Sequence, residues 1–167
     1  ETNSFNNVEI YNVAVSEKSG EGIVFLLSSA GNSGGTHFAS NPSAALVKDL
    51  ERANYEISKI NISSIDEIVK ERKISLIKID IEGAEPFALK GAIKTLKNSR
   101  PLILSEINPI CLRANGNMEP TEFILFMQDL NYQGFLLNND GSVGDSICDS
   151  WKFGDDWKNI LFKPIPV

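Results

Sequence analysis

The sequence LIKIDIEGAE (residues 76–85), which leads on to PLILSEI (residues 101–107), decides the fold of this chain. Residues 76–81 form a short apolar run rich in isoleucine, which is typical of a strand covered on both faces. Pro86 suits the first turn of a helix, where its missing N–H is no loss. Apolar residues then recur at helical spacing as far as Leu96. The pattern predicts two parallel strands joined by a right-handed helical crossover.

Three acidic residues lie where open α/β sheets bind their ligands, at the carboxyl ends of the strands. Asp80 and Glu82 close the first strand, and Glu106 closes the second. Because Asp80 and Glu82 are two residues apart, they share one side of the extended chain. If the two strands are neighbours, the three carboxylates meet at one edge, where crowding raises a carboxyl pKa. These three residues are therefore the candidate catalytic groups, with Asp80 first.

The same stretch resembles the signature of the FkbM-type methyltransferases. The likeness is carried by KIDIEGAE (residues 78–85), LKGA (residues 89–92) and PLILSE (residues 101–106). The resemblance implies an α/β fold with the seven-stranded Rossmann-like sheet of class I methyltransferases and antiparallel final strands. It also implies an enzyme that takes a methyl group from S-adenosylmethionine. The acceptors that it implies are hydroxyl oxygens of sugars and of natural products such as polyketides.

The resemblance extends more loosely to both ends of the chain, at residues 8–16, 64–68 and 159–164. The family begins with a strand, a glycine-rich cofactor turn and a second strand, and none of these is found here. We therefore expect an incomplete sheet that lacks its first two strands. Because the first residue is Glu1 and not methionine, we expect residues 1–167 to be one α/β domain, the carboxyl-terminal two-thirds of a methyltransferase domain.

Methyl transfer requires the acceptor to be held in line with the methyl donor and to lose a proton. The resemblance places Asp80 and Gly83 beside the cofactor. His37, the one histidine, lies in a long polar segment at residues 28–43 and is a further candidate base. Asn108 and Trp151 are candidate contacts for the acceptor. His37 and Trp151 also have plain structural interpretations, as a loop residue and as packing on the sheet.

Two other functions remain open. Asp80, Glu82 and Glu106 could hold Mg²⁺ through their oxygens, as in phosphoryl transfer or hydrolysis. No phosphate-cradling glycine loop accompanies them, so our first interpretation includes no metal. The chain could also be a truncated domain that binds without catalysis. Glu85, in the first turn of the predicted helix, fits a favourable charge at a helix N-terminus as well as it fits a site.

Composition excludes several classes of protein. The 167 residues are 42% hydrophobic and carry a net charge of −6, with acids and bases mixed, which argues against nucleic acid as a partner. No apolar run approaches the ~20 residues of a membrane span. Cys111 and Cys148 are widely separated and are expected to be reduced thiols, with a disulfide between them as the alternative. We therefore expect a cytoplasmic protein with a small-molecule hydroxyl acceptor, and a homo-oligomer is one arrangement it could adopt.

The remaining pattern predicts the other elements. Ser64 and Glu67 fit a capping box. The resemblance to the family at residues 64–68 implies that Asp66 is structural and not chemical. Glu119 and Pro120 open a helix, and residues 139–141 form a turn. Strands are expected at residues 8–16, 23–27, 57–62, 134–137 and 159–164, a helix at 44–54, and irregular segments at 28–43, 113–117 and 142–158.

Overall fold

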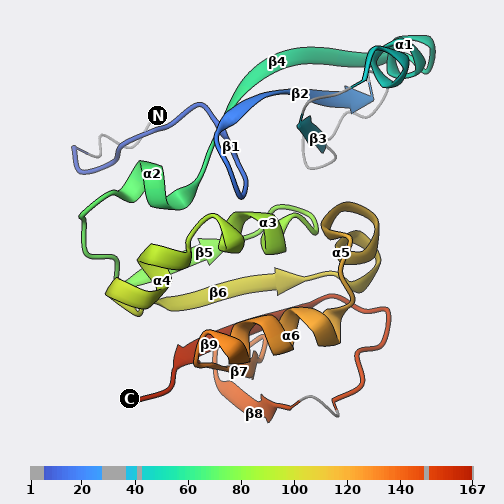
Figure 1. Ribbon diagram of the computed structural model, residues 1–167. Helices are drawn as coiled ribbons and strands as arrows, with labels where there is room; N and C mark the ends of the chain where they lie inside the picture. The colour runs from blue at the N-terminus through green and yellow to red at the C-terminus, as the bar shows by residue number, and fades with distance from the viewer. Residues whose placement is uncertain (1–5, 28–36, 41–42, 149–150, 167) are drawn as a thin grey trace. The chain divides into compact units, whose positions relative to one another are not determined.

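The computed structural model describes residues 6–27, 37–40, 43–148 and 151–166. It is a mixed α/β structure with two sheets, which contain parallel and antiparallel strands (Figure 1). The chain divides into two compact units. One comprises residues 1–14 and 18–63, and the other comprises residues 15–17 and 64–167. That the whole chain is one domain stays a prediction.

The sheet of the first unit has the strand order β1-β4-β2-β3. Strand β2 runs antiparallel to both β3 and β4. Ser43 caps helix α1, because its side chain accepts a hydrogen bond from the Leu46 N–H. Few of the side chains described in this unit are buried, and Ile10 is 90% exposed. The elements are β2 (Gly20–Leu27), β3 (His37–Ser40), α1 (Ala44–Arg52) and β4 (Tyr55–Ser63), together with β1 (Ala14–Val15), whose second residue is assigned to the other unit.

The sheet of the second unit has the order β5-β6-β9-β7-β8. Strands β5 and β6 are parallel, and β9 lies antiparallel between β6 and β7. The strands are β5 (Leu76–Ile79), β6 (Leu102–Ile107), β7 (Tyr132–Leu137), β8 (Val143–Ile147) and β9 (Lys158–Pro164). The predicted parallel pair and the antiparallel final strands are therefore confirmed.

Five helices of the described chain accompany this sheet, and α3 and α4 form the crossover between β5 and β6 (Figure 1). The core is fully buried at Phe123, Tyr132 and Phe162, and the rings of Phe123 and Phe162 meet edge-on at 5.9 Å. Helix α6 begins with the capping box of Glu119 and Glu122. The helices are α2 (Ile65–Val69), α3 (Glu85–Lys90), α4 (Ile93–Ser99), α5 (Pro109–Gly116) and α6 (Pro120–Asp129).

The single helix predicted after Pro86 is wrong, because the chain forms two helices separated at Gly91 and Ala92. A Cβ on Gly91 would lie 2.2 Å from the Ser16 carbonyl oxygen, so the backbone of residue 16 occupies this space. The Gly91 carbonyl accepts a hydrogen bond from the Asp66 N–H at 2.9 Å. The Asp66 carboxylate then accepts from the N–H groups of Lys94 and Thr95 at the start of α4. Asp66 is therefore structural, as predicted.

Four other expectations need correction. Residues 113–116 belong to helix α5, which begins behind the cap Asn108 and has Pro109 in its first turn. Strand β3 lies inside the segment predicted to be irregular, since residues 37–40 pair with β2. Strand β8 likewise lies inside residues 142–158 and pairs with β7. The strand predicted at residues 8–16 is limited to Ala14–Val15.

Among the described residues, no helix combines the length and the apolar character needed to cross a membrane. The thiol of Cys111 is not part of a disulfide bond.

Candidate functional site

The carboxyl ends of β5 and β6 bring the three predicted carboxylates together. The register of the parallel pair ends with Ile79 opposite Ser105, so Asp80 and Glu106 follow at the next position. The pKa of Glu106 is raised, first by burial and then by the negative charges of Asp80 and Glu82. The Lys78 ammonium lies 3.3 Å from the Asp80 carboxylate and partly offsets this charge. The edge is therefore acidic and holds a carboxyl group with a raised proton affinity.

A tight turn connects this edge to helix α3. The Ala84 N–H donates to the Ile81 carbonyl at 3.2 Å, and the two central residues, Glu82 and Gly83, have φ angles of 54° and 94°. Two positive φ angles are typical of a type I′ turn. A Cβ on Gly83 would lie 2.2 Å from the Cys111 carbonyl oxygen, so glycine is required both by its φ and by the close approach of α5.

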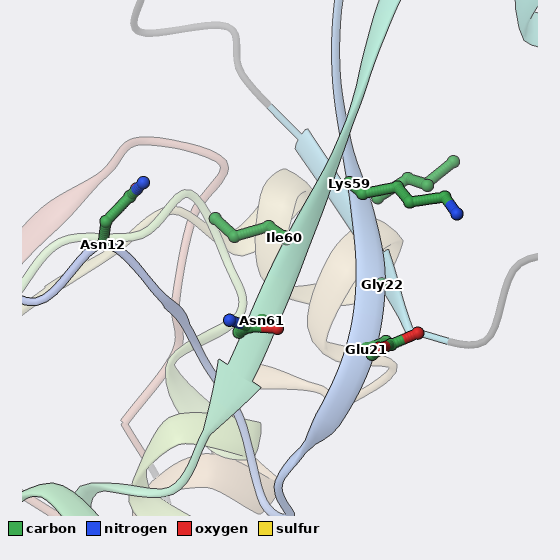
Figure 2. A pocket seen from close by; sticks show the side chains of 7 residues that line it. Asn12, Glu21, Gly22, Lys59, Ile60 and Asn61 are labelled. Atoms are coloured by element: carbon green, nitrogen blue, oxygen red, sulfur yellow. The ribbon is translucent and has the colours of Figure 1, made fainter.

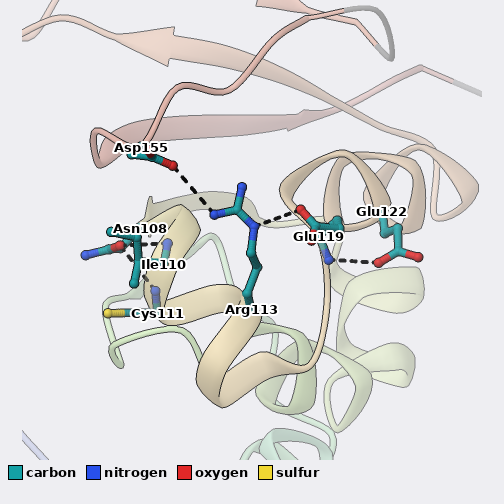
Figure 3. Close-up of polar contacts among 7 residues, drawn as sticks. All are labelled: Asn108, Ile110, Cys111, Arg113, Glu119, Glu122 and Asp155. Atoms are coloured by element: carbon teal, nitrogen blue, oxygen red, sulfur yellow. Dashed lines mark hydrogen bonds and ion pairs between the residues drawn. The ribbon is translucent and has the colours of Figure 1, made fainter.

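Helix α5 supports the turn from the other side. The Asn108 side-chain oxygen accepts hydrogen bonds from the N–H groups of Ile110 and Cys111 at 3.1 and 3.2 Å and so caps the helix (Figure 3). The Asn115 side-chain amide donates to the Glu82 carbonyl at 2.6 Å. The cap oxygen of Asn108 therefore has a structural partner, and its contact with an acceptor stays a prediction.

The thiol of Cys111 also faces the turn. Its sulfur lies 3.8 Å from a Glu82 carboxylate oxygen, to which it donates a hydrogen bond. Burial raises the pKa of this thiol, and the charge of Glu82 raises it further. Because the thiolate is the nucleophile and a raised pKa depletes it, Cys111 is not suited to nucleophilic catalysis.

An ion-pair bridge holds the segment before β9 against α5. The Arg113 guanidinium lies 2.9 Å from the Glu119 carboxylate and 3.7 Å from that of Asp155 (Figure 3). Trp151 is half-buried in the same segment, packs against the core and meets the Phe153 ring edge-on at 4.5 Å. The indole is thus a packing group, and its predicted contact with substrate has not been tested.

His37 lies in strand β3 of the first unit, opposite Phe25. Its side chain lies outside the described residues, so its role as a base stays a prediction. The first unit also has an open hollow of about 510 Å³ between polar and apolar side chains of β2, β4 and Asn12 (Figure 2). None of the predicted site residues with a described side chain lines it.

Sequence reasoning left the role of Glu85 undecided. Its side chain is 1% exposed, and one carboxylate oxygen accepts a hydrogen bond from the Ile81 N–H at 2.9 Å. The sequence signal that could have pointed to a role for Glu85 is the spacing E-G-x-E, which places it three residues after Glu82. Within the part of the chain that the structure describes, no group of three histidine, cysteine or acidic residues is arranged to hold a metal ion.

Residues 1–133 match the model of a protein family described as the methyltransferase FkbM domain. This match covers more than half of the chain and confirms the resemblance carried by residues 78–106. Searches of curated proteins and of solved structures returned no significant match.

Proposed function

The chain belongs to the FkbM methyltransferase family, and from this premise we propose that it takes part in methyl transfer from S-adenosylmethionine to a hydroxyl oxygen. The proposed acceptor is a sugar or a small molecule of the natural-product type. The observation that carries the proposal is the acidic edge formed by Asp80, Glu82 and Glu106. S-adenosylmethionine supplies a methyl group on a positively charged sulfonium, and an edge with this charge suits such a cofactor.

The roles of the residues follow from their positions. Asp80 and Gly83, at the end of β5, would lie on the cofactor side. Glu106 accepts the proton of the acceptor hydroxyl, because its raised pKa brings it closer to neutral pH. Asp80 and Glu82 maintain that pKa through their charge, and the rigid turn keeps the three groups in one geometry.

The fold proposal accompanies the functional one. The second sheet corresponds to the carboxyl-terminal strands of a Rossmann-like class I methyltransferase. Its support is the parallel pair β5 and β6 next to the antiparallel β9. The sequence shows no glycine-rich cofactor turn, so the chain supplies the acceptor side and part of the cofactor pocket.

The test is methyl transfer from radiolabelled S-adenosylmethionine to a panel of hydroxylated acceptors. It uses this chain and, if the gene encodes one, the longer protein that contains it. Glu106→Gln is expected to lower kcat roughly 100-fold or more, the scale of one general base. Asp145→Asn, which changes an exposed acid on β8, is the matched control and leaves kcat unchanged.

Calorimetry separates this function from the two alternatives. Saturable Mg²⁺ binding that Asp80→Asn abolishes would favour phosphoryl transfer or hydrolysis. Binding of S-adenosylmethionine without methylation of any hydroxylated acceptor would favour a binding domain. Absence of cofactor binding by the longer protein would contradict the proposal.

A further inference from the structure

Glu85 is a buried carboxyl group that the proposed chemistry does not use. It is the first residue of α3, a position where an acidic side chain is usually exposed to water. Its side chain is 1% exposed, and the second carboxylate oxygen, Oε2, makes no hydrogen bond with any part of the chain that is described. Burial of a carboxyl group is costly unless its oxygens have partners, so this placement requires an explanation.

The carboxyl group faces the backbone of the turn at residues 81–84. Oε1 accepts the Ile81 N–H at 2.9 Å. The N–H groups of Gly83 and of Glu85 itself also favour the ionised form of this carboxyl, although burial has the larger effect and raises its pKa. The side chain of Glu85 therefore lies behind the turn and contacts the residue at which the turn begins.

The turn needs this support because its geometry is unfavourable. Glu82 has a φ of 54°, which costs a residue other than glycine roughly 1 kcal/mol or more. The Asn115 side chain holds the Glu82 carbonyl from α5, and Gly83 packs against the α5 backbone. These contacts fix the second half of the turn. Glu85 holds its first half, next to Asp80.

We propose that Glu85 is a positioning residue, whose hydrogen bond to the Ile81 N–H fixes the turn and thereby holds Asp80 and Glu82 beside Glu106. The purpose assigned to the turn rests on the proposed function, but the geometry does not. Glu85 acts through the backbone and does not touch substrate. The feature that matters is an acceptor oxygen at this place, and not the charge.

Two substitutions separate the acceptor from the charge. Glu85→Gln keeps an oxygen that can accept the Ile81 N–H and removes the charge. Glu85→Met fills similar space and removes both. Glu122→Met is the matched control, because the Glu122 carboxylate accepts a backbone N–H, that of Glu119, at a helix start on α6.

The first measurement is amide hydrogen exchange at Ile81 by NMR, normalised to the core amides of Ile103 and Phe162 in the same sample. We expect exchange at Ile81 to accelerate roughly 10-fold or more in Glu85→Met, the scale of one lost hydrogen bond. Exchange in Glu85→Gln and Glu122→Met is expected to stay close to that of the unchanged chain. If Glu85→Met does not fold, Glu85→Asp takes its place, because its carboxylate is withdrawn by one methylene and is expected to accelerate exchange in the same way.

The second measurement is the titration of Glu106, followed by carbon NMR of its side chain. In Glu85→Met we expect the turn to move away from β6, so that the charges of Asp80 and Glu82 raise the pKa of Glu106 less and this pKa falls. In Glu85→Gln the turn is expected to stay in place, and the pKa of Glu106 stays raised. Unchanged Ile81 exchange and unchanged Glu106 titration in Glu85→Met, or in Glu85→Asp if it replaces Met, would overturn the inference. Equal changes in the Gln and Met variants would overturn it too, because charge would then be the cause.

These outcomes are separable from failure of the proposed function. Where methyl transfer is detected, kcat is expected to fall in Glu85→Met and to stay close to that of the unchanged chain in Glu85→Gln. The KM for the cofactor is expected to change little in both variants. If no methyl transfer occurs but the exchange pattern appears, the proposed function fails and the support of the turn by Glu85 stands.

Discussion

The carboxylates of Asp66 and Glu85 both accept hydrogen bonds from backbone N–H groups near the start of a helix. They differ in how many of their oxygens have a hydrogen-bond partner. Asp66 accepts hydrogen bonds from the Lys94 and Thr95 N–H groups at 3.0 and 2.8 Å and from the Thr95 hydroxyl at 2.7 Å. Glu85 accepts one at 2.9 Å, while its other oxygen is buried without a hydrogen bond among the described residues. Both carboxylate oxygens of Asp66 have hydrogen-bond partners, which accounts for its structural role. The incomplete bonding of Glu85 indicates that the turn beside it is held at an energetic cost.

The largest effect is expected at the turn itself, from Gly83→Ala. The new Cβ would lie 2.2 Å from a backbone oxygen and require a φ of 94°, so we expect destabilisation by about 3 kcal/mol. Urea denaturation measures it. Gly141→Ala is the matched control, because Gly141 has a φ of 83° with open space around it, and we expect it to cost about 1 kcal/mol. Equal losses of unfolding free energy in the two variants would show that close contact with α5 does not add to the cost of a side chain at residue 83.

The next effect is expected at Asp66. Asp66→Ala removes three hydrogen bonds and leaves the first amides of α4 without their cap, so we expect a loss of about 2 kcal/mol in the free energy of unfolding. Asp49→Ala, which removes an exposed ion pair with Arg52, is expected to cost less than about 0.5 kcal/mol. If Asp66→Ala were no more costly than Asp49→Ala, the contrast with Glu85 would disappear.

A smaller effect is expected in the pH dependence of stability. Burial raises the pKa of Glu85 above its ordinary value of 4.5, so the folded state holds this proton more tightly than the unfolded state. This contribution to stability is present in full below pH 4.5 and is lost as the pH rises through the folded pKa. The slope of this loss is at most about 1.4 kcal/mol per pH unit.

Glu85→Gln removes that slope, because the amide does not titrate. The comparison of denaturation midpoints from pH 4 upward isolates one carboxyl, since the other titrating groups are common to both chains. Parallel curves for Glu85→Gln and the unchanged chain would show that Glu85 titrates normally.

The acidic edge could be predicted from the sequence because local rules determine it. An isoleucine-rich run, a helix that begins near Pro86 and a second apolar run leave only a parallel pair, and such a pair brings Asp80 and Glu106 to the same end. Helix α5 and its cap were not predicted, although Asn108 followed by Pro109 is a local signal for a helix start. The side chain of Asn108 was nevertheless assigned to the acceptor, because a residue after a strand end suits either role.

The burial of Glu85 could not be predicted, because it depends on parts of the chain that are distant in sequence. The turn is closed by Asn115 and by the Cys111 backbone, about 30 residues further on. The division of the crossover into α3 and α4 likewise depends on residue 16, whose carbonyl occupies the space beside Gly91. The spacing of apolar residues along the sequence carries no information about these contacts.

The smallest effect is expected from Lys78, whose ammonium lies beside Asp80 at the acidic edge. Lys78 lowers the pKa of Glu106, against the larger raising effects of burial, Asp80 and Glu82. Lys78→Met is therefore expected to raise the pKa of Glu106 further, as measured by carbon NMR titration at low salt. Lys94→Met, beside Asp66, is the matched control and is expected to leave Glu106 unchanged. Because the Lys78 side chain is 64% exposed, added salt should weaken the difference. A shift of equal size in both variants would mean that Glu106 responds to the net charge of the chain, and not to the arrangement of groups around it.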